Sequence, residues 1–366
     1  MNLDALLERL QACGWAKAIK DVPRELLTQE KLANFLRSIE EEKAGRLVLQ
    51  SKPSIFVVEP TNRCNLRCAL CPTGQTDASV AKGDMPLAVF KRVVDQAAES
   101  AIVMNLLNWG EPTLHSELPE MIRYAADRGI WTVVSTNFSR RYPPGYLEAL
   151  LTSGLGVLHI DLDGPDPETY RVYRRGGDFG LVVENARNVV ALKRKLGLQY
   201  PLIESAMMVM RHNERFTGEF ESLCRDIGFD RFFLGKLQID PASGRDWLPS
   251  DPGASYANYF QDDQPQSCMR LYAFMVVNWS GNVAPCCLTY DAAADFGNIA
   301  SGSLWDVWNN ELFQSARAVF HPDGVGRPGT ICRLCHNRLG SAQVPHYKSS
   351  FALALPATNL QQKGGA

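Results

Sequence analysis

The sequence has little net charge and no long hydrophobic run. Lys and Arg number 38 against 40 Asp and Glu, a formal net charge of −2. That balance gives no electrostatic reason to expect binding to nucleic acid or to an anionic membrane. The longest apolar run, residues 101–107, is far shorter than the ~18 residues of a membrane-spanning helix. The N-terminal stretch MNLDALLERLQ lacks the apolar core of a secretory signal, so we expect a cytoplasmic protein.

Cysteine, by contrast, is plentiful. The chain has 10 cysteines, although disulfides are rare in the cytoplasm. They are clustered: one group lies within residues 64–71 and a second group lies within residues 268–335. Clustered thiols in a reducing compartment indicate metal or redox chemistry.

Between residues 54 and 237, strand-like apolar runs alternate with amphipathic helices. Such alternation implies a parallel sheet with right-handed crossovers. Six βα units are too few for an eight-stranded barrel, so we predict an α/β fold, a partial (βα)6 barrel. The predicted strands are residues 54–59, 101–107, 130–135, 157–161, 202–210 and 231–237, and the predicted helices are residues 85–98, 117–127, 145–151, 181–196 and 215–227.

The remaining segments complete a prediction of four regions. A helical extension has two amphipathic stretches, residues 3–13 and 26–42, and the cysteine-rich module has a hairpin turn at Ser280-Gly281-Asn282 and a helix at residues 304–320. The predicted regions are residues 1–50 (extension), 51–240 (partial barrel), 241–345 (module) and 346–366 (tail).

The first cysteine group, Cys64, Cys68 and Cys71, follows directly on the first predicted strand with the spacing C-x3-C-x2-C. Active sites of parallel α/β barrels lie at the carboxyl ends of the strands. Three thiolates are too few to close a tetrahedral zinc site, whereas a four-iron cluster held by three cysteines keeps one iron open. A structural zinc site completed by a remote residue is the alternative.

This motif resembles that of the radical S-adenosylmethionine (radical SAM) superfamily. The resemblance implies that Cys64, Cys68 and Cys71 bind a 4Fe-4S cluster whose open iron chelates SAM. One electron then cleaves SAM to methionine and a 5′-deoxyadenosyl radical. The resemblance also implies an electron donor such as flavodoxin or ferredoxin.

Later strand ends resemble the SAM-binding motifs of that family. Asn108-Trp109-Gly110-Glu111-Pro112 is similar to a Gly-Gly-Glu-Pro motif whose backbone and carboxylate hold the methionine amino group, although Trp109 replaces a glycine. Arg175, with a planar fork suited to two oxygens, is expected to bind the methionine carboxylate. The residues that the resemblance assigns to SAM are Gly110, Glu111, Ser135, Asn137, Asp161, Asp163 and Arg175.

The second group supplies Cys268, Cys286, Cys332 and Cys335, enough for a four-thiolate site. On spacing alone a zinc ribbon remains an alternative. The pattern C-x12-G-x4-C with a distant C-x2-C resembles the auxiliary-cluster module of SPASM and twitch radical SAM enzymes, which implies a second 4Fe-4S cluster. Cys286 fits the glycine spacing better than Cys287, and both stay open as the ligand. Four protein thiolates leave no open iron, so electron transfer is the natural role.

The one-cluster layout is similar to that of 2-deoxy-scyllo-inosamine dehydrogenase-like enzymes of antibiotic biosynthesis. The resemblance implies an oxidoreductase that dehydrogenates a sugar or aminocyclitol-type small molecule, with the auxiliary cluster as electron acceptor. Redox-neutral epimerisation or dehydration, and modification of a ribosomally made peptide, are the alternatives. Many peptide enzymes carry an N-terminal winged-helix-like domain, whereas residues 1–50 are helical in pattern. Asp240, Arg245 and Asp246 are candidates for substrate handling, where an acid would serve as base.

Overall fold

One mixed sheet organises the fold. The computed structural model describes residues 2–75, 80–237, 244–255, 268–300, 302–320 and 330–334. Within these residues a nine-stranded sheet has the order β6-β5-β4-β3-β2-β1-β7-β8-β9, and β1 to β6 pair in parallel, which confirms the partial (βα)6 barrel. These strands are β1 (Ile55–Val58), β2 (Val103–Leu106), β3 (Trp131–Thr136), β4 (Val157–Asp161), β5 (Leu202–Val209) and β6 (Arg231–Lys236).

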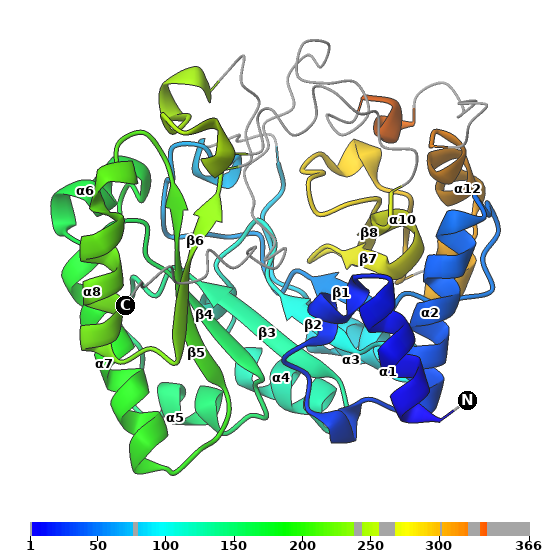
Figure 1. The fold of residues 1–366 in the computed structure, drawn as a ribbon, viewed down its shortest axis with the longest axis horizontal. Helices are drawn as coiled ribbons and strands as arrows, with labels where there is room; N and C mark the ends of the chain where they lie inside the picture. Colours follow the sequence, from blue (N-terminus) through cyan, green and yellow to red (C-terminus); the bar gives the residue numbers. More distant parts are fainter. Residues whose placement is uncertain are drawn as a thin grey trace, which may run out of the picture.

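Helices connect the parallel strands, and α7 and α8 lie beside β5 and β6 (Figure 1). In α3, Phe90, Val93, Val94 and Ala97 form the buried apolar stripe that the sequence predicts. The helices of this part of the chain are α3 (Leu87–Ala97), α4 (Leu118–Ala126), α5 (Tyr146–Leu151), α6 (Pro167–Tyr173), α7 (Phe179–Lys195) and α8 (Thr217–Ile227).

Helix α6 is absent from the predicted elements. Its start is encoded locally: Asp166 accepts hydrogen bonds from the N–H groups of Glu168 and Thr169, and Pro167 occupies the first helical position. An Asp-Pro pair is a signal for a helix N-terminus, but the helix has only 7 residues, too few to show a clear periodicity.

The cysteine-rich module extends the sheet of the barrel. Strand β7 (Phe274–Val277) pairs in parallel with β1, and β8 (Asn282–Ala284) and β9 (Gly297–Asn298) follow antiparallel. The predicted hairpin turn is confirmed, with Gly281 at a φ of 82° that favours glycine. Further helices are α10 (Arg270–Ala273), α11 (Leu304–Trp308) and α12 (Glu311–Ala318).

The single helix predicted at residues 304–320 is wrong, because two helices occupy this stretch. Asn310 breaks it by accepting hydrogen bonds from the N–H groups of Leu312 and Phe313, which caps α12. Short 3-10 turns lie at Trp15–Ile19, Arg24–Leu26, Thr73–Gln75, Pro112–Leu114, Glu214–Phe216, Arg245–Trp247, Pro252–Ala254, Ala292–Ala294 and Ile331–Leu334.

The N-terminal helices α1 (Leu3–Ala12) and α2 (Gln29–Lys43) are part of the main core. Asp21, between them, forms two hydrogen bonds of 2.7 and 2.8 Å with the guanidinium of Arg231 in β6. Lys31 Nζ donates to the carbonyl of Gly129 at 2.6 Å. These contacts tie the extension to the barrel. No helix in the described part of the chain combines the length and apolarity that a membrane span requires.

Arg317 of α12 is a buried cation, 1% exposed, that holds three segments together. It donates to the carbonyls of Leu271 (3.0 Å), Leu47 (2.8 Å) and Trp308 (2.8 Å). Burial lowers the pKa of Arg317 to about 9. The carbonyls satisfy a cation that would otherwise be costly to bury.

We expect Arg317→Met to lower the free energy of unfolding by roughly 3 kcal/mol, because each stranded buried carbonyl costs about 1–3 kcal/mol. Urea denaturation of the anaerobically purified protein measures this. Arg225→Met is the control, since that side chain is 70% exposed. Equal midpoints for the two variants would contradict the assignment.

Candidate functional site

The first three cysteines share one pocket in the loop that follows β1. Cys64, Cys68 and Cys71 pack against the same group of apolar side chains, which includes Tyr173 and Met210. Burial, with a smaller contribution from the Glu111 carboxylate, raises the pKa of Cys64 to about 12, and burial raises that of Cys68 to about 12. Three close thiols in such surroundings become thiolates readily only beside a cationic centre. The donor set therefore fits an iron-sulfur cluster.

Hydrogen bonds to sulfur accompany this pocket. The Leu66 N–H donates to Cys64 Sγ at 3.4 Å, and Asn137 Nδ2 donates to the same sulfur at 3.8 Å. Such bonds help to set the potential of a bound cluster. In the described ranges, no three His, Cys, Asp or Glu side chains converge closely enough for a single metal ion.

Gly110 places the end of β2 directly on the cysteine loop. A Cβ at this position would lie 1.9 Å from the Thr61 carbonyl oxygen and 2.9 Å from that of Arg63. The next residue, Glu111, donates its N–H to the Arg63 carbonyl at 2.7 Å. Only glycine permits this approach, so the predicted SAM-binding turn is fastened to the cluster-binding loop.

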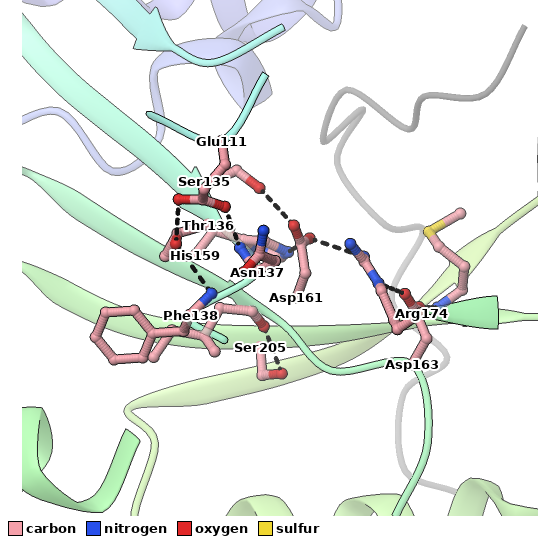
Figure 2. A network of polar contacts seen from close by, with 12 residues as sticks. Glu111, Ser135, Thr136, Asn137, Phe138, His159, Asp161, Asp163, Arg174 and Ser205 are labelled. Atoms are coloured by element: carbon pink, nitrogen blue, oxygen red, sulfur yellow. Dashed lines mark hydrogen bonds and ion pairs between the residues drawn. The ribbon is translucent and has the colours of Figure 1, made fainter. Parts of the chain in front are cut away.

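The Glu111 carboxylate is buried, 2% exposed, and links β2 to β3 (Figure 2). It accepts hydrogen bonds from Thr113 Oγ1 (2.6 Å), Thr136 Oγ1 (2.7 Å) and the Asn137 N–H (2.7 Å). Burial raises the pKa of Glu111, while these donors oppose that shift. The carboxylate thus fixes the geometry of the turn, and its contact with the methionine amino group stays a prediction.

Asp161 is the last residue of β4, Asp163 follows two residues later, and Arg174 contacts both (Figure 2). Arg174 Nε donates to Asp163 Oδ2 at 2.6 Å, and its Nη2 lies 3.5 Å from Asp161 Oδ1. Ser135 Oγ donates to Asp161 Oδ2 at 3.3 Å. Although burial raises the pKa of Asp161, Arg174 and His159 together hold it below its usual value. The predicted residues Ser135, Asp161 and Asp163 therefore lie close together. The arginine that joins the two aspartates is Arg174, whereas the sequence predicted a role for the adjacent Arg175.

Arg175 points to a different place. It is exposed and lines a cavity of about 580 Å³ with Asn65, Arg67, Gly74 and Gly176, on the cysteine loop. The Arg67 N–H donates to the Arg175 carbonyl at 2.8 Å. A side chain in this cavity does not contact Asp161 or Asp163, so the two arginines have separate environments. Binding of the methionine carboxylate by Arg175 stays a prediction.

A row of charged side chains, His159, Glu204 and Arg231, continues from Asp161 on the same face of the sheet. His159 Nδ1 is 3.0 Å from Glu204 Oε1, and its Nε2 is 3.4 Å from Asp161 Oδ1. Burial would lower the pKa of His159, but the two carboxylates raise it to about 10. Arg231 pairs with Glu204 in turn. Strand alternation places these side chains on one face, a signal that the sequence carries but that the motifs do not use.

The second cysteine group is described at Cys268, Cys286, Cys287 and Cys332, and Cys335 lies outside the described residues. Cys287 is 3% exposed and receives a 2.8 Å hydrogen bond from Arg270 Nη1. Cys286 is less buried and accepts from the Leu288 N–H at 3.4 Å. The neighbouring Cys287 thiol lowers the pKa of Cys286. Cys286 as the cluster ligand, with Cys287 as its buried neighbour, stays a prediction.

The substrate-handling role of Asp240, Arg245 and Asp246 stays a prediction. Asp240 lies outside the described residues, and Arg245 and Asp246 are exposed in their 3-10 turn. The next residue, Trp247, instead packs against the cysteine loop and lies edge-on to Tyr173. The contact that this segment makes with the site is thus aromatic.

Glu59 is a residue that the motifs missed. It directly follows β1, is 2% exposed, and accepts hydrogen bonds from the N–H groups of Trp109 (3.0 Å) and Trp279 (3.2 Å). Burial raises the pKa of Glu59 to about 7. Nearby Asp295 has its pKa raised to about 6, also by burial. The sequence signal that could have identified Glu59 is an acidic residue placed directly after a buried strand.

Comparison with known proteins assigns both regions. Residues 58–214 match the radical SAM superfamily, and residues 268–336 match SPASM, an iron-sulfur cluster-binding domain. The chain therefore contains a radical SAM domain followed by a SPASM domain. It is a radical SAM enzyme whose cofactors are SAM, the 4Fe-4S cluster that binds SAM, and an auxiliary 4Fe-4S cluster.

Individual relatives are distant. AdoMet-dependent heme synthase of Methanosarcina barkeri is 27% identical over 51% of this chain. The match covers 52% of that protein, so this chain spans about half the length of that relative. PqqA peptide cyclase of Xanthomonas oryzae pv. oryzae is 24% identical over 78% of this chain and 81% of that protein. The crystal structure of Streptococcus suis SuiB bound to S-adenosylmethionine has a TM-score of 0.56 at 17% identity, covering 76% of this chain and 70% of that one. The last similarity establishes a shared fold.

We expect replacement of Cys64, Cys68 and Cys71 by alanine to abolish formation of 5′-deoxyadenosine. Iron should fall from about eight to about four atoms per chain, because the second cluster is held elsewhere. Iron analysis and chromatography after anaerobic reconstitution measure both. Deoxyadenosine at the wild-type rate would contradict the site, and about four irons with one zinc in the wild type would favour a zinc ribbon.

Glu59 predicts a pH dependence of stability. Its folded-state pKa near 7 exceeds the value of about 4.3 in an unfolded chain. The folded protein therefore binds the proton more tightly, and the free energy of unfolding falls as the pH rises from about 4.5 through 7. The contribution is roughly 3 kcal/mol.

Urea midpoints between pH 5 and 8.5 measure it. In Glu59→Gln, the free energy of unfolding should decrease less steeply above pH 6. The decrease at lower pH should remain, because Asp295 still titrates there. Parallel profiles for the wild type and the variant would show that Glu59 does not titrate in this range.

Proposed function

We propose that the protein oxidises a secondary alcohol of a sugar or aminocyclitol-type small molecule to a ketone. The observation that carries the proposal is the layout of the second cysteine group, in which Cys268, Cys286 and Cys332 follow the barrel. This layout is similar to that of 2-deoxy-scyllo-inosamine dehydrogenase-like enzymes. The polar side chains Ser135, Asp161 and Arg174, which meet near the carboxyl ends of the strands, are kept for SAM.

The chemistry balances with one hydrogen atom, one proton and one electron. Forming the ketone breaks the carbinol C–H bond, releases the hydroxyl proton, and leaves one electron to be removed. Bound SAM and its cluster supply the hydrogen abstraction, and the auxiliary cluster supplies the acceptor for the electron. The protein's residues hold the hydroxyl groups and receive the proton. A flavodoxin or ferredoxin is the proposed donor of the electron that starts each turnover.

Modification of a ribosomally made peptide is the second candidate. It is supported by the relative named PqqA peptide cyclase, whose match spans 78% of this chain. In residues 2–46, however, the structure has helices and 3-10 turns that pack into the core through residues such as Leu10 and Phe35. A docked helical segment of this kind differs from a winged-helix-like peptide-recognition domain with a β-hairpin.

We expect the anaerobically reconstituted enzyme with SAM, dithionite and a panel of aminocyclitols to form a product two mass units lighter, with one 5′-deoxyadenosine per product. Mass spectrometry of both species tests this. Cys332→Ala should keep SAM cleavage but lower the ketone at least fivefold, because the acceptor site is opened.

A product of unchanged mass would identify an epimerisation, and loss of water would identify a dehydration. Turnover of peptides but of no small molecule would replace the proposal with the second candidate.

A further inference from the structure

Trp109 contacts the segments that lead to both cysteine groups: Glu59, just before the first group, and Thr289, just after Cys286. We propose that Trp109 is a positioning residue that sets the spacing between the SAM-cluster loop and the auxiliary-cluster segment. The inference deepens the proposed function, because transfer of the substrate's electron to the auxiliary site depends on that spacing. The spacing itself is set by contacts within this chain and does not depend on the substrate.

The indole side of Trp109 binds the auxiliary-cluster segment. Its Nε1 donates to the Thr289 carbonyl at 3.0 Å, three residues after Cys286. The ring meets Tyr290 edge to face, with centroids 5.3 Å apart and an interplanar angle of 85°. Lys82 Nζ donates to the Tyr290 hydroxyl at 3.0 Å and closes this contact from the outside. Trp109 itself is 4% exposed, so the hydrogen bond is shielded from water.

The backbone side of Trp109 is held to the SAM-cluster loop. Its N–H donates to Glu59 Oε1 at 3.0 Å, and Glu59 stands five residues before Cys64. The adjacent Gly110 has no Cβ and therefore lies against Thr61. One residue thus connects the two cysteine segments through two short links.

Glu59 braces the same link from the other strand. Its second oxygen accepts the Trp279 N–H at 3.2 Å, just after β7 of the module. The Trp279 ring lies where a Cβ on Gly83 would come within 2.1 Å, so the segment after the cysteine loop also packs on it. Relative movement of the two sites would break the hydrogen bonds that the buried Glu59 carboxylate accepts from two backbone N–H groups. Leaving these groups unpaired is costly.

The identity of residue 109 matters for this link. A glycine, usual in the motif that residues 109–112 resemble, would keep the backbone bond to Glu59. It would lose both the Thr289 hydrogen bond and the Tyr290 contact. Phenylalanine keeps an aromatic ring but loses the indole N–H, so the two substitutions separate packing from hydrogen bonding.

The test compares Trp109→Phe and Trp109→Gly with Trp131→Phe. Trp131 is a matched control: it is 5% exposed and meets Tyr200 edge to face at 5.0 Å and 88°, but it lies at the opposite end of the strands. Each protein is reconstituted anaerobically and reduced with dithionite. Electron paramagnetic resonance then measures the magnetic interaction between the two reduced clusters, which depends directly on their separation.

We expect Trp109→Gly to weaken that interaction at least twofold, Trp109→Phe to have a smaller effect, and Trp131→Phe to match the wild type. Iron content should stay unchanged in all three. If Trp109→Gly fails to load both clusters, Tyr290→Leu replaces it, since it removes the ring contact from the partly exposed side. The proposal would be overturned if the magnetic interaction stayed at the wild-type value in Trp109→Phe and also in Trp109→Gly, or in Tyr290→Leu where Trp109→Gly does not bind both clusters.

A second measurement links spacing to reaction. With an alcohol that the wild type oxidises, Trp109→Gly should raise the ratio of 5′-deoxyadenosine to ketone at least threefold. An unchanged ratio would limit Trp109 to structure and overturn its role in electron transfer. If the wild type oxidises no alcohol, the proposed function fails while the magnetic measurement still decides the spacing.

Discussion

Buried carboxylates that reach from one strand end to the next hold the functional edge of this sheet. Glu59 joins β1 to the segments after β2 and β7, and Glu111 joins β2 to β3. Asp163 accepts the Met208 N–H at 2.8 Å and so joins β4 to β5. Parallel strands offer no hairpins at their carboxyl ends, and these acids supply the missing lateral links. The cysteine loop and the predicted SAM-binding turn depend on them for their relative position.

The buried carboxylates of this edge fix its geometry and add little stability. A buried carboxylate loses its hydration, and hydrogen bonds from backbone N–H groups do little more than offset that loss. The raised pKa values of Glu59 and Glu111 record the imbalance. Asp161 differs, because Arg174 and protonated His159 compensate its charge. The polar face near Asp161 is therefore ionised at neutral pH, while Glu59 is close to its midpoint.

The sequence predicted the local pattern of the barrel and less of its assembly. The observed bounds of the six parallel strands lie within two residues of the predictions, since continuous apolar runs bounded by turns are local signals. The pairing of β7 with β1 was not predicted, because partners more than 200 residues apart leave no trace in either segment. Arg174 was missed for a related reason: the motif Arg174-Arg175-Gly176 names two arginines, and only tertiary packing selects which one meets Asp161 and Asp163.

Strand β1 is the element that both cofactor regions share. Its hydrogen bonds join β2 on one side and β7 on the other, with Val57 opposite Asn105 and Val276. The cysteine loop leaves β1, the predicted SAM-binding turn leaves β2, and Cys286 follows β8, which pairs antiparallel with β7. The predicted radical and auxiliary sites are therefore built on the four adjacent strands β2, β1, β7 and β8 of one sheet, not on two bodies joined by a linker. Variation of substrate in such a framework has to come from the loops above the strands, since movement of the strands would disturb both cofactors together.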